Sequence, residues 1–416
     1  MVRFVRNIGE DSGLILEVSR KSQVRILSEI LIFSPLFLPW LPEWTKFVPD
    51  AAWVFLGVLA GKGAVLWYGK RTKGLLWWAL GGLFLFGIVY LFRYQRLGYF
   101  LWGVRNNFRF YAAFFGFLLL EKQEREGIWR SLEGLFWVNF GLVLGQFLFF
   151  GRKGDYLGGL FGTEKGCNGG LNLFLLTMVA KSLLSAEDGD GCALTKCAVS
   201  LLISALAELK FFFVEFAVLL VLTGFRRKKA VAFWAVLALA GGVLLMERCF
   251  PEFAGWMRFS SILETAADPA GYASTGDLNR LNAIPEIDRR VFLSGWDKVF
   301  GLGLGNCDVS GFSFLTTPFS KWYDHLHYSW MSHAFWYLEG GWLGIVFFFG
   351  FFCPVWLENP GKYSRSLAVL CLFVGIYNAS LRTEAAFLIY FGMTEGFPAE
   401  YPAGESPRPT EAGGNF

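Results

Sequence analysis

The sequence is short of the residues that a water-soluble surface needs. Charged residues make up 17% of the 416 residues, against about 25% in typical soluble domains. Hydrophobic residues make up 54% and aromatic residues 19%, which excludes an intrinsically disordered chain. This balance argues against a soluble enzyme, and the small net charge of +4 gives no electrostatic support for a nucleic-acid partner.

Cysteine and histidine are also scarce. The seven cysteines are an odd number without a repeated spacing, and Cys192 and Cys197 lack the second pair that would complete a zinc site. This excludes a disulfide scaffold, and we expect ordinary thiols, no metal and no other cofactor. The three histidines, in contrast, all fall within residues 325–333.

Long apolar runs are what the sequence has in abundance, each about as long as the roughly 17–25 residues that cross a bilayer. They lie near 26–42, 51–68, 74–92, 98–120, 128–150, 168–184, 193–209, 211–225, 230–249, 332–357, 364–380 and 384–397. We therefore expect an all-α fold, a polytopic transmembrane helix bundle of about 10–12 spans with one large extracytoplasmic loop.

The distribution of Lys and Arg gives the expected orientation, because basic residues concentrate in short cytoplasmic loops. Arg-Arg-Lys-Lys at 226–229 is the strongest anchor of this kind, and it places residues 250–331 outside. The predicted organisation is a cytoplasmic N-terminal arm (1–25), transmembrane helices (26–249), the extracytoplasmic loop (250–331), C-terminal transmembrane helices (332–397) and a disordered tail (398–416). The chain would be a multi-pass cell-membrane protein with both termini cytoplasmic.

Two interpretations are open for residues 193–225, where two short apolar runs meet at Lys210. One is a short outer turn whose charged side chains reach the membrane interface. The other is a pair of broken or re-entrant helices whose charged junction lines a cavity, because ionisable groups at membrane depth normally face protein or water.

Arg105 and Arg109 interrupt the run at 98–120. Their spacing puts both guanidinium groups on one helical face, which favours an anion site because a guanidinium fork matches phosphate oxygens. The alternative is that they end an outer half-turn and pair with lipid headgroups. Arg382 and Glu384 interrupt the last apolar stretch, and for them we expect a structural pair with each other across a break between spans.

The histidines stand where the long loop re-enters the membrane. His325 and His327 would suit a metal only in an extended segment, with His333 as a third ligand. No recognised zinc signature surrounds them, so we favour proton transfer near neutral pH over hydrogen-bonded core histidines.

Upstream of the histidines, Gly301, Gly303 and Gly305 resemble a nucleotide loop only superficially, and a closely packed turn fits better. Arg280, Arg289 and Arg290 precede this turn as either surface charges or site residues.

The order of these features resembles the O-antigen ligase and O-antigen polymerase superfamily of bacterial envelopes. The shared features are Arg289 and Arg290, Trp296, the turn Gly301–Asn306, a histidine, and the run Leu338–Gly344. Phe161-Gly162 followed by Asn168 is similar to an outer turn of that family, and Lys210 falls where its members often carry an Arg. The resemblance covers roughly residues 155–357.

The sequence departs from the family pattern at two places. Members of the family usually carry a histidine at a fixed distance before the glycine that corresponds to Gly341. This chain has Trp330 at that position. His327 and His333 lie on either side of it, and the sequence does not decide which of them is equivalent to the family histidine. Lys210 replaces an Arg and loses its bidentate fork.

The resemblance implies transfer of a glycan from an undecaprenyl-diphosphate-linked donor to a glycan acceptor outside the cytoplasmic membrane, without metal or nucleotide sugar. Polymerisation of repeat units is preferred over ligation. His327 is the expected general base with His325 in reserve, and the expected substrate-binding residues are Arg105, Arg109, Lys210, Arg280, Arg289 and Arg290. Membrane lipid and a polysaccharide chain-length regulator would be further partners.

Two rival functions remain. A transporter or flippase of lipid-linked glycans would also use intramembrane arginines, but it would show internal repeats with matching broken helices, and we find no repeat. A different envelope transferase would place an acidic residue in the first outer loop, but that loop spans only Glu43 to Asp50.

Overall fold

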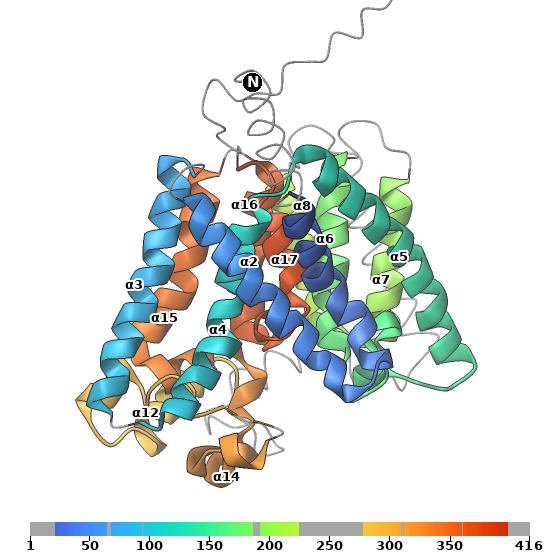
Figure 1. Cartoon of the computed structure of the whole chain (residues 1–416). Helices are drawn as coiled ribbons and strands as arrows, with labels where there is room; N and C mark the ends of the chain where they lie inside the picture. Colours follow the sequence, from blue (N-terminus) through green and yellow to red (C-terminus); the bar gives the residue numbers. More distant parts are fainter. Residues whose placement is uncertain are drawn as a thin grey trace, which may run out of the picture.

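The computed structural model describes residues 21–64, 68–93, 95–185, 192–223, 278–308, 310, 312–359 and 361–397. The predicted arm up to residue 20, the predicted span at 230–249, the loop residues 250–277 and the tail at 398–416 lie outside the described residues. Within the described part the chain is all-α and contains no β-strand (Figure 1).

The helices follow the predicted apolar runs. Residues 21–37 form a helix, followed by α2 (Val48–Ala64), α3 (Lys70–Phe92), α4 (Leu97–Phe117), α5 (Lys122–Leu148), α6 (Asn168–Ser185), α7 (Ala193–Leu206) and α8 (Lys210–Thr223). Beyond residue 277 come α12 (Ala283–Arg290), α13 (Gly295–Phe300), α14 (Pro318–Tyr323), α15 (Ser332–Glu358), α16 (Lys362–Tyr377) and α17 (Ala386–Met393). Short 3-10 turns connect them, among them η2 (Glu43–Phe47), η4 (Gly159–Phe161), η7 (Asp324–Leu326), η8 (Tyr328–Trp330) and η9 (Ser380–Arg382).

The core lies around α4, α6, α16 and α17. Every residue of α17 is buried, as expected for a helix that is apolar on all sides. In contrast, α3 and α5 expose large apolar side chains, among them Trp77, Phe84 and Leu148. Because α3, α5 and α15 are each long and apolar enough to cross a membrane, this exposed apolar surface gives the chain the character of a membrane protein.

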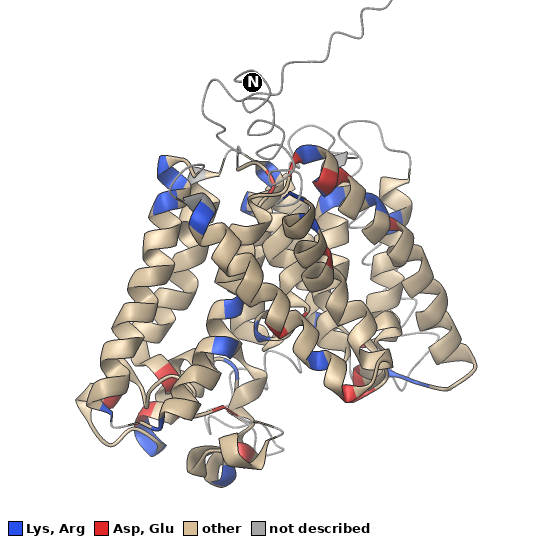
Figure 2. Ribbon diagram, in the orientation of Figure 1, with Lys and Arg blue, Asp and Glu red and all other residues tan. Residues whose placement is uncertain are grey.

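Basic residues gather at one end of the helices, which we call the basic end. There α3 begins with Lys70 and Arg71, α5 begins with Lys122, and α16 begins with Lys362. Figure 2 shows this concentration of Lys and Arg, and it shows basic and acidic residues interspersed at the opposite end, near α12 and α14. The structure therefore has two chemically different ends.

A break in α15 joins the Gly-rich turn to the helices. Gly341 has φ 58° and ψ −150°, a conformation open to glycine, and it interrupts the helical hydrogen bonds of α15. The carbonyls of Leu338 and Glu339 accept hydrogen bonds from the backbone N–H groups of Leu302 and Gly303, at 2.8 and 3.0 Å. The predicted close-packed turn is confirmed, and it packs into the gap that this break opens.

The junction of α7 and α8 is a tight turn between two 14-residue helices. At 1.5 Å per residue each is about 21 Å long, which is shorter than the roughly 30 Å hydrocarbon core. Glu208 in this turn has φ 54°, and the side-chain amide of Asn168 reaches the carbonyl of Ala207 at 3.4 Å. The charged junction therefore packs against the start of α6, and both interpretations of it stay open.

Candidate functional site

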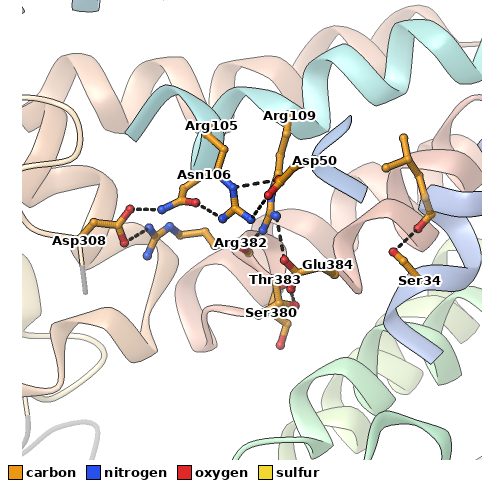
Figure 3. Close-up of polar contacts among 11 residues, drawn as sticks. Ser34, Asp50, Arg105, Asn106, Arg109, Asp308, Ser380, Arg382, Thr383 and Glu384 are labelled. Carbon is orange, nitrogen blue, oxygen red and sulfur yellow. Dashed lines mark hydrogen bonds and ion pairs between the residues drawn. The ribbon is translucent and has the colours of Figure 1, made fainter. Parts of the chain in front are cut away.

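Three arginines, two from α4 and one from η9, meet in one partly buried group of ion pairs (Figure 3). On α4, the Arg105 guanidinium donates to both carboxylate oxygens of Asp50, at 2.9 and 2.8 Å. One turn later Arg109 donates to Glu384 Oε1 at 2.8 Å. The predicted common face of Arg105 and Arg109 is confirmed: both extend from α4 toward Arg382 and Glu384 in Figure 3.

Arg382, on η9, is the third arginine. Its Nη2 donates to Asp308 Oδ1 at 3.3 Å and its Nε donates to Asn107 Oδ1 at 3.4 Å. Its guanidinium carbon lies 3.0 Å from the centre of the Phe335 ring. Asp308 is also joined to α4 by a hydrogen bond from Asn106. We call Arg105, Arg109 and Arg382, with Asp50, Asp308 and Glu384, the guanidinium cluster.

The expected pair between Arg382 and Glu384 is wrong. Glu384 binds Arg109 and Arg382 binds Asp308. The turn η9 ends at Arg382 and α17 begins at Ala386, so the two side chains leave the chain where it changes direction. Each therefore reaches a different partner, and the predicted break between spans contributes two residues to the cluster.

The Gly-rich turn holds Asp308 in position. A Cβ on Gly305 would lie 1.9 Å from the Tyr99 carbonyl oxygen, so only glycine lets the turn approach α4 this closely. The backbone N–H of Cys307 donates to Glu339 Oε1 at 3.1 Å, and the Tyr328 hydroxyl donates to the Cys307 carbonyl at 2.6 Å. Because a carboxylate of the chain itself takes up the Cys307 N–H, the turn positions side chains and does not resemble a phosphate loop.

Two groups behind this turn are held in their neutral forms. Burial raises the pKa of the Cys307 thiol well above its usual value. Burial also raises the pKa of the Tyr328 phenol, so Tyr328 stays a hydrogen-bond donor across the physiological pH range. Neither group is suited to nucleophilic or acid–base chemistry there.

The cluster is buried on one side and open on the other. Arg109 is the most enclosed arginine, with 3% of its side chain exposed, whereas 35% of the Glu384 side chain is exposed. Arg105 and Asp50 are about equally accessible, at 23% and 21%. Each of the three guanidinium groups has a carboxylate partner, so an added anion would have to replace a carboxylate.

An apolar groove runs along α4 from Val104, which precedes Arg105 in the chain, to Phe115, and Lys73 of the basic end also lines it. It has a volume of about 620 Å³ between α2, α3 and α4, and Val104, Trp53 and Phe108 contribute to its walls. Gly57 and Gly61 on α2 also line it, and the absence of side chains there leaves room. The groove could take a long apolar chain whose polar end lies at the guanidinium cluster.

The histidines have three different environments. His325 lies exposed on η7, and His333 is buried on α15 with 5% exposure. His327 is half-buried, has φ 51°, and stacks on Trp330 with ring centres 3.9 Å apart. Among the described residues, no group of three or more His, Cys, Asp or Glu side chains is arranged to hold a metal ion.

Arg280 and Phe211, the residue after Lys210, both contact Tyr377 at the end of α16. The Arg280 guanidinium lies over the Tyr377 ring at 4.5 Å and donates from Nε to the Tyr377 carbonyl. Phe211, the neighbour of Lys210, stacks on the same ring at 4.0 Å. Lys210 and Arg280 therefore lie near the end of α16. Among the described residues, neither makes a hydrogen bond or an ion pair with the guanidinium cluster.

The side chains of Arg289 and Arg290 form ion pairs within their own helix. Both donate to Glu286 on their own helix, α12, and their side chains are 61% and 50% exposed. Nearby, Arg93 at the end of α3 pairs with Asp297 at 2.7 Å. Burial alone would raise the pKa of Asp297, but hydrogen bonds from Ser294 and Arg93 outweigh it and lower this pKa. The long-range contact of this region is thus made by Asp297, which the sequence did not single out.

Sequence reasoning missed two acidic members of the cluster, Asp50 and Asp308, and it gave Arg382 and Glu384 the wrong partners. Asp50 stands at the start of α2 and Asp308 directly follows the Gly-rich turn. A search for carboxylates at the same predicted membrane end as Arg105 would have found Asp50. No local signal marks Asp308.

Neither the family models nor the curated proteins with which the chain was compared gave a match. The resemblance to the O-antigen ligase and polymerase superfamily therefore stays a prediction, and function is inferred from the chemistry of the cluster.

Proposed function

We propose that the chain is a multi-pass membrane glycosyltransferase that moves a glycan from an undecaprenyl-diphosphate-linked donor to a glycan acceptor. The observation that supports this function is the convergence of Arg105, Arg109 and Arg382 in one partly open cluster. Guanidinium forks bind phosphate oxygens bidentately, and fixed positive charge stabilises a diphosphate leaving group. The basic end faces the cytoplasm, following the positive-inside rule, so transfer takes place on the extracytoplasmic side.

Donor binding in this proposal is an exchange of partners. Asp50 and Glu384 are the more exposed carboxylates, at 21% and 35%, whereas Asp308 is 8% exposed. The diphosphate replaces Asp50 on Arg105 and Glu384 on Arg109, while Arg382 keeps Asp308. The polyprenyl chain then lies in the groove between α2, α3 and α4.

His327 is the proposed general base. It is the half-buried histidine, held against Trp330, whereas His325 is exposed and His333 is enclosed in the helices. The acceptor hydroxyl gives its proton to His327 while its oxygen attacks the anomeric carbon of the donor sugar. The bond between that carbon and the diphosphate oxygen breaks, and the lipid diphosphate leaves.

The direct test measures polymer length and lipid-linked intermediates in cells that carry Arg105→Gln or His327→Ala. Loss of a donor to the leaving group costs about 100-fold or more in rate, so we expect short polymer and accumulated lipid-linked units. Arg289→Gln is the matched control. The sequence predicted Arg289 as a substrate-binding residue, but its side chain is 61% exposed and pairs with Glu286 on its own helix, so we expect full-length polymer. Normal polymer in Arg105→Gln would refute the assignment of the cluster.

The same experiment also tests the second candidate function, transport of lipid-linked glycans. A transferase defect leaves the accumulated glycan on the outer side, where a membrane-impermeant glycosidase can remove it. A transport defect leaves it protected on the cytoplasmic side. Protected glycan in the His327→Ala cells would therefore overturn transfer in favour of transport.

A further inference from the structure

A second polar site lies at the basic end, away from the guanidinium cluster. It is a pocket of about 850 Å³ between α5, the end of α6 and the turn that follows α17. The first turns of α5 supply one wall, with Lys122, Arg125, Glu126, Trp129, Arg130 and Glu133. These positions repeat at helical spacing, so they form one stripe along the face of α5.

The length of α5 sets the depth of this pocket. The helix has 27 residues and is one of those able to cross a membrane. At 1.5 Å per residue it is about 40 Å long, against a hydrocarbon core of about 30 Å. The charged stripe at its start therefore lies at the level of the lipid headgroups, at the end where Figure 2 shows the basic residues gathered.

The carboxylates of the pocket already have cationic partners. Glu395 accepts two hydrogen bonds from Lys181, at 2.7 and 2.8 Å, and Glu133 pairs with Lys196 at 3.0 Å. Glu126 is a weaker case, since it lies 3.9 Å from Lys122 and both are largely exposed. Little negative charge of the protein is therefore left to neutralise further cations.

Among the described residues, the pocket is lined by four cationic side chains, Lys122, Arg125, Arg130 and Lys181, and by three carboxylates, Glu126, Glu133 and Glu395. Arg125 donates to the neutral oxygens of Leu120, Phe117 and Thr394, at 2.7 to 3.0 Å. Arg130 donates from Nε to the Glu126 carbonyl at 3.4 Å, and within the part of the chain that the structure describes it has no carboxylate partner. An anion would give Arg130 a charged partner, and among the pairs named above it would compete only with the long contact between Lys122 and Glu126.

We propose that this pocket binds the phosphate of an anionic phospholipid, with Lys122 and Arg130 as the cations that contact it. The headgroup depth and the apolar walls made by Leu120, Trp129 and Phe397 favour a lipid over free phosphate. Basic pockets between transmembrane helices on the cytoplasmic side are a recognised type of lipid site. The site depends on α5 crossing the bilayer and is independent of glycan transfer.

The test measures binding of phosphatidylglycerol to the delipidated full-length protein by native mass spectrometry. Phosphatidylcholine with the same acyl chains is the uncharged reference. Each basic residue near the membrane surface contributes about fivefold in affinity, so Lys122→Gln/Arg130→Gln should weaken phosphatidylglycerol binding by roughly 25-fold. Glu126→Gln should strengthen it severalfold, a gain that damage to the fold does not produce.

Lys70→Gln/Arg71→Gln is the matched control, since it removes two charges from the start of another helix at the same end and neither residue lines this pocket or the apolar groove. It should leave the preference for phosphatidylglycerol unchanged. An equal loss of phosphatidylglycerol binding in this control would show that general attraction to the basic surface, and not the pocket, causes the preference. Equal binding of both lipids by the unmodified protein, or displacement of phosphatidylglycerol by excess inorganic phosphate, would overturn the lipid site.

Discussion

Arg109 and Arg289 are both ion-paired to a glutamate, yet the two pairs are made in opposite ways. Arg109 reaches Glu384, 275 residues away in the chain, and its side chain is 3% exposed. Arg289 reaches Glu286, three residues earlier on α12, and is 61% exposed. The first pair exists only when α4 meets the segment before α17, whereas the second needs only the helix. The pair of Arg109 therefore joins distant segments of the fold, whereas the pair of Arg289 stabilises only its own helix.

The largest expected effect comes from removing one partner of the buried pair. Arg109→Met leaves Glu384 without its direct cationic partner, which costs about 3 kcal/mol, the low end of the usual range because Glu384 is partly exposed. The measurement is thermal unfolding in detergent, followed by tryptophan fluorescence.

The double variant Arg109→Met/Glu384→Met separates stability from function. Replacement of a whole ion pair by apolar side chains is often close to neutral, so most of the lost stability should return. Polymer synthesis should not return, since the diphosphate still lacks Arg109. A double variant that unfolds as readily as the single one would show that the pair is not the cause of the loss.

An effect of intermediate size is expected for Asp297, whose ion pair with Arg93 joins α13 to the end of α3. Asp297→Asn keeps the shape but loses the charge, and we expect a loss of about 1 kcal/mol at neutral pH. The folded-state pKa of Asp297 is lowered, so its contribution is present above the unfolded pKa of about 4 and is lost as the pH falls through the folded value.

The pH dependence makes the Asp297 prediction specific. The difference in unfolding temperature between Asp297→Asn and the unmodified protein should be constant above about pH 5 and should shrink below about pH 4. Lys298→Gln is the control on the same helix, and its half-exposed pair with Asp288 should contribute less than about 0.5 kcal/mol. A difference that grows on acidification would contradict the sign given for Asp297.

The helices could be predicted from the sequence because their cause is local. Apolar runs recur from Val48 to Met393, and the described helices follow most of them closely. Among these helices α3, α5 and α15 are long and apolar enough to cross a membrane, whereas α17 has only 8 residues. Arg105 and Arg109 could be singled out for the same reason, since charges in an apolar run are costly. Their partners could not, because Asp50, Asp308 and Glu384 are set by how distant segments pack. The error over Arg382 and Glu384 arose from assigning a partner by closeness in sequence.

The smallest expected effect is that of Arg289→Gln. Glu286 is 9% exposed and accepts hydrogen bonds from both Arg289 and Arg290, so either arginine alone keeps this carboxylate paired. The single variant should change the free energy of unfolding by less than about 0.5 kcal/mol, measured by the same thermal unfolding.

Arg289→Gln/Arg290→Gln should cost more, about 1–2 kcal/mol, because Glu286 is then left buried and unpaired. Glu286→Gln added to the double variant should restore most of the loss. A single variant as harmful as the double would mean that Arg289 has a partner beyond its own helix, and the contrast between the two kinds of pair would no longer hold.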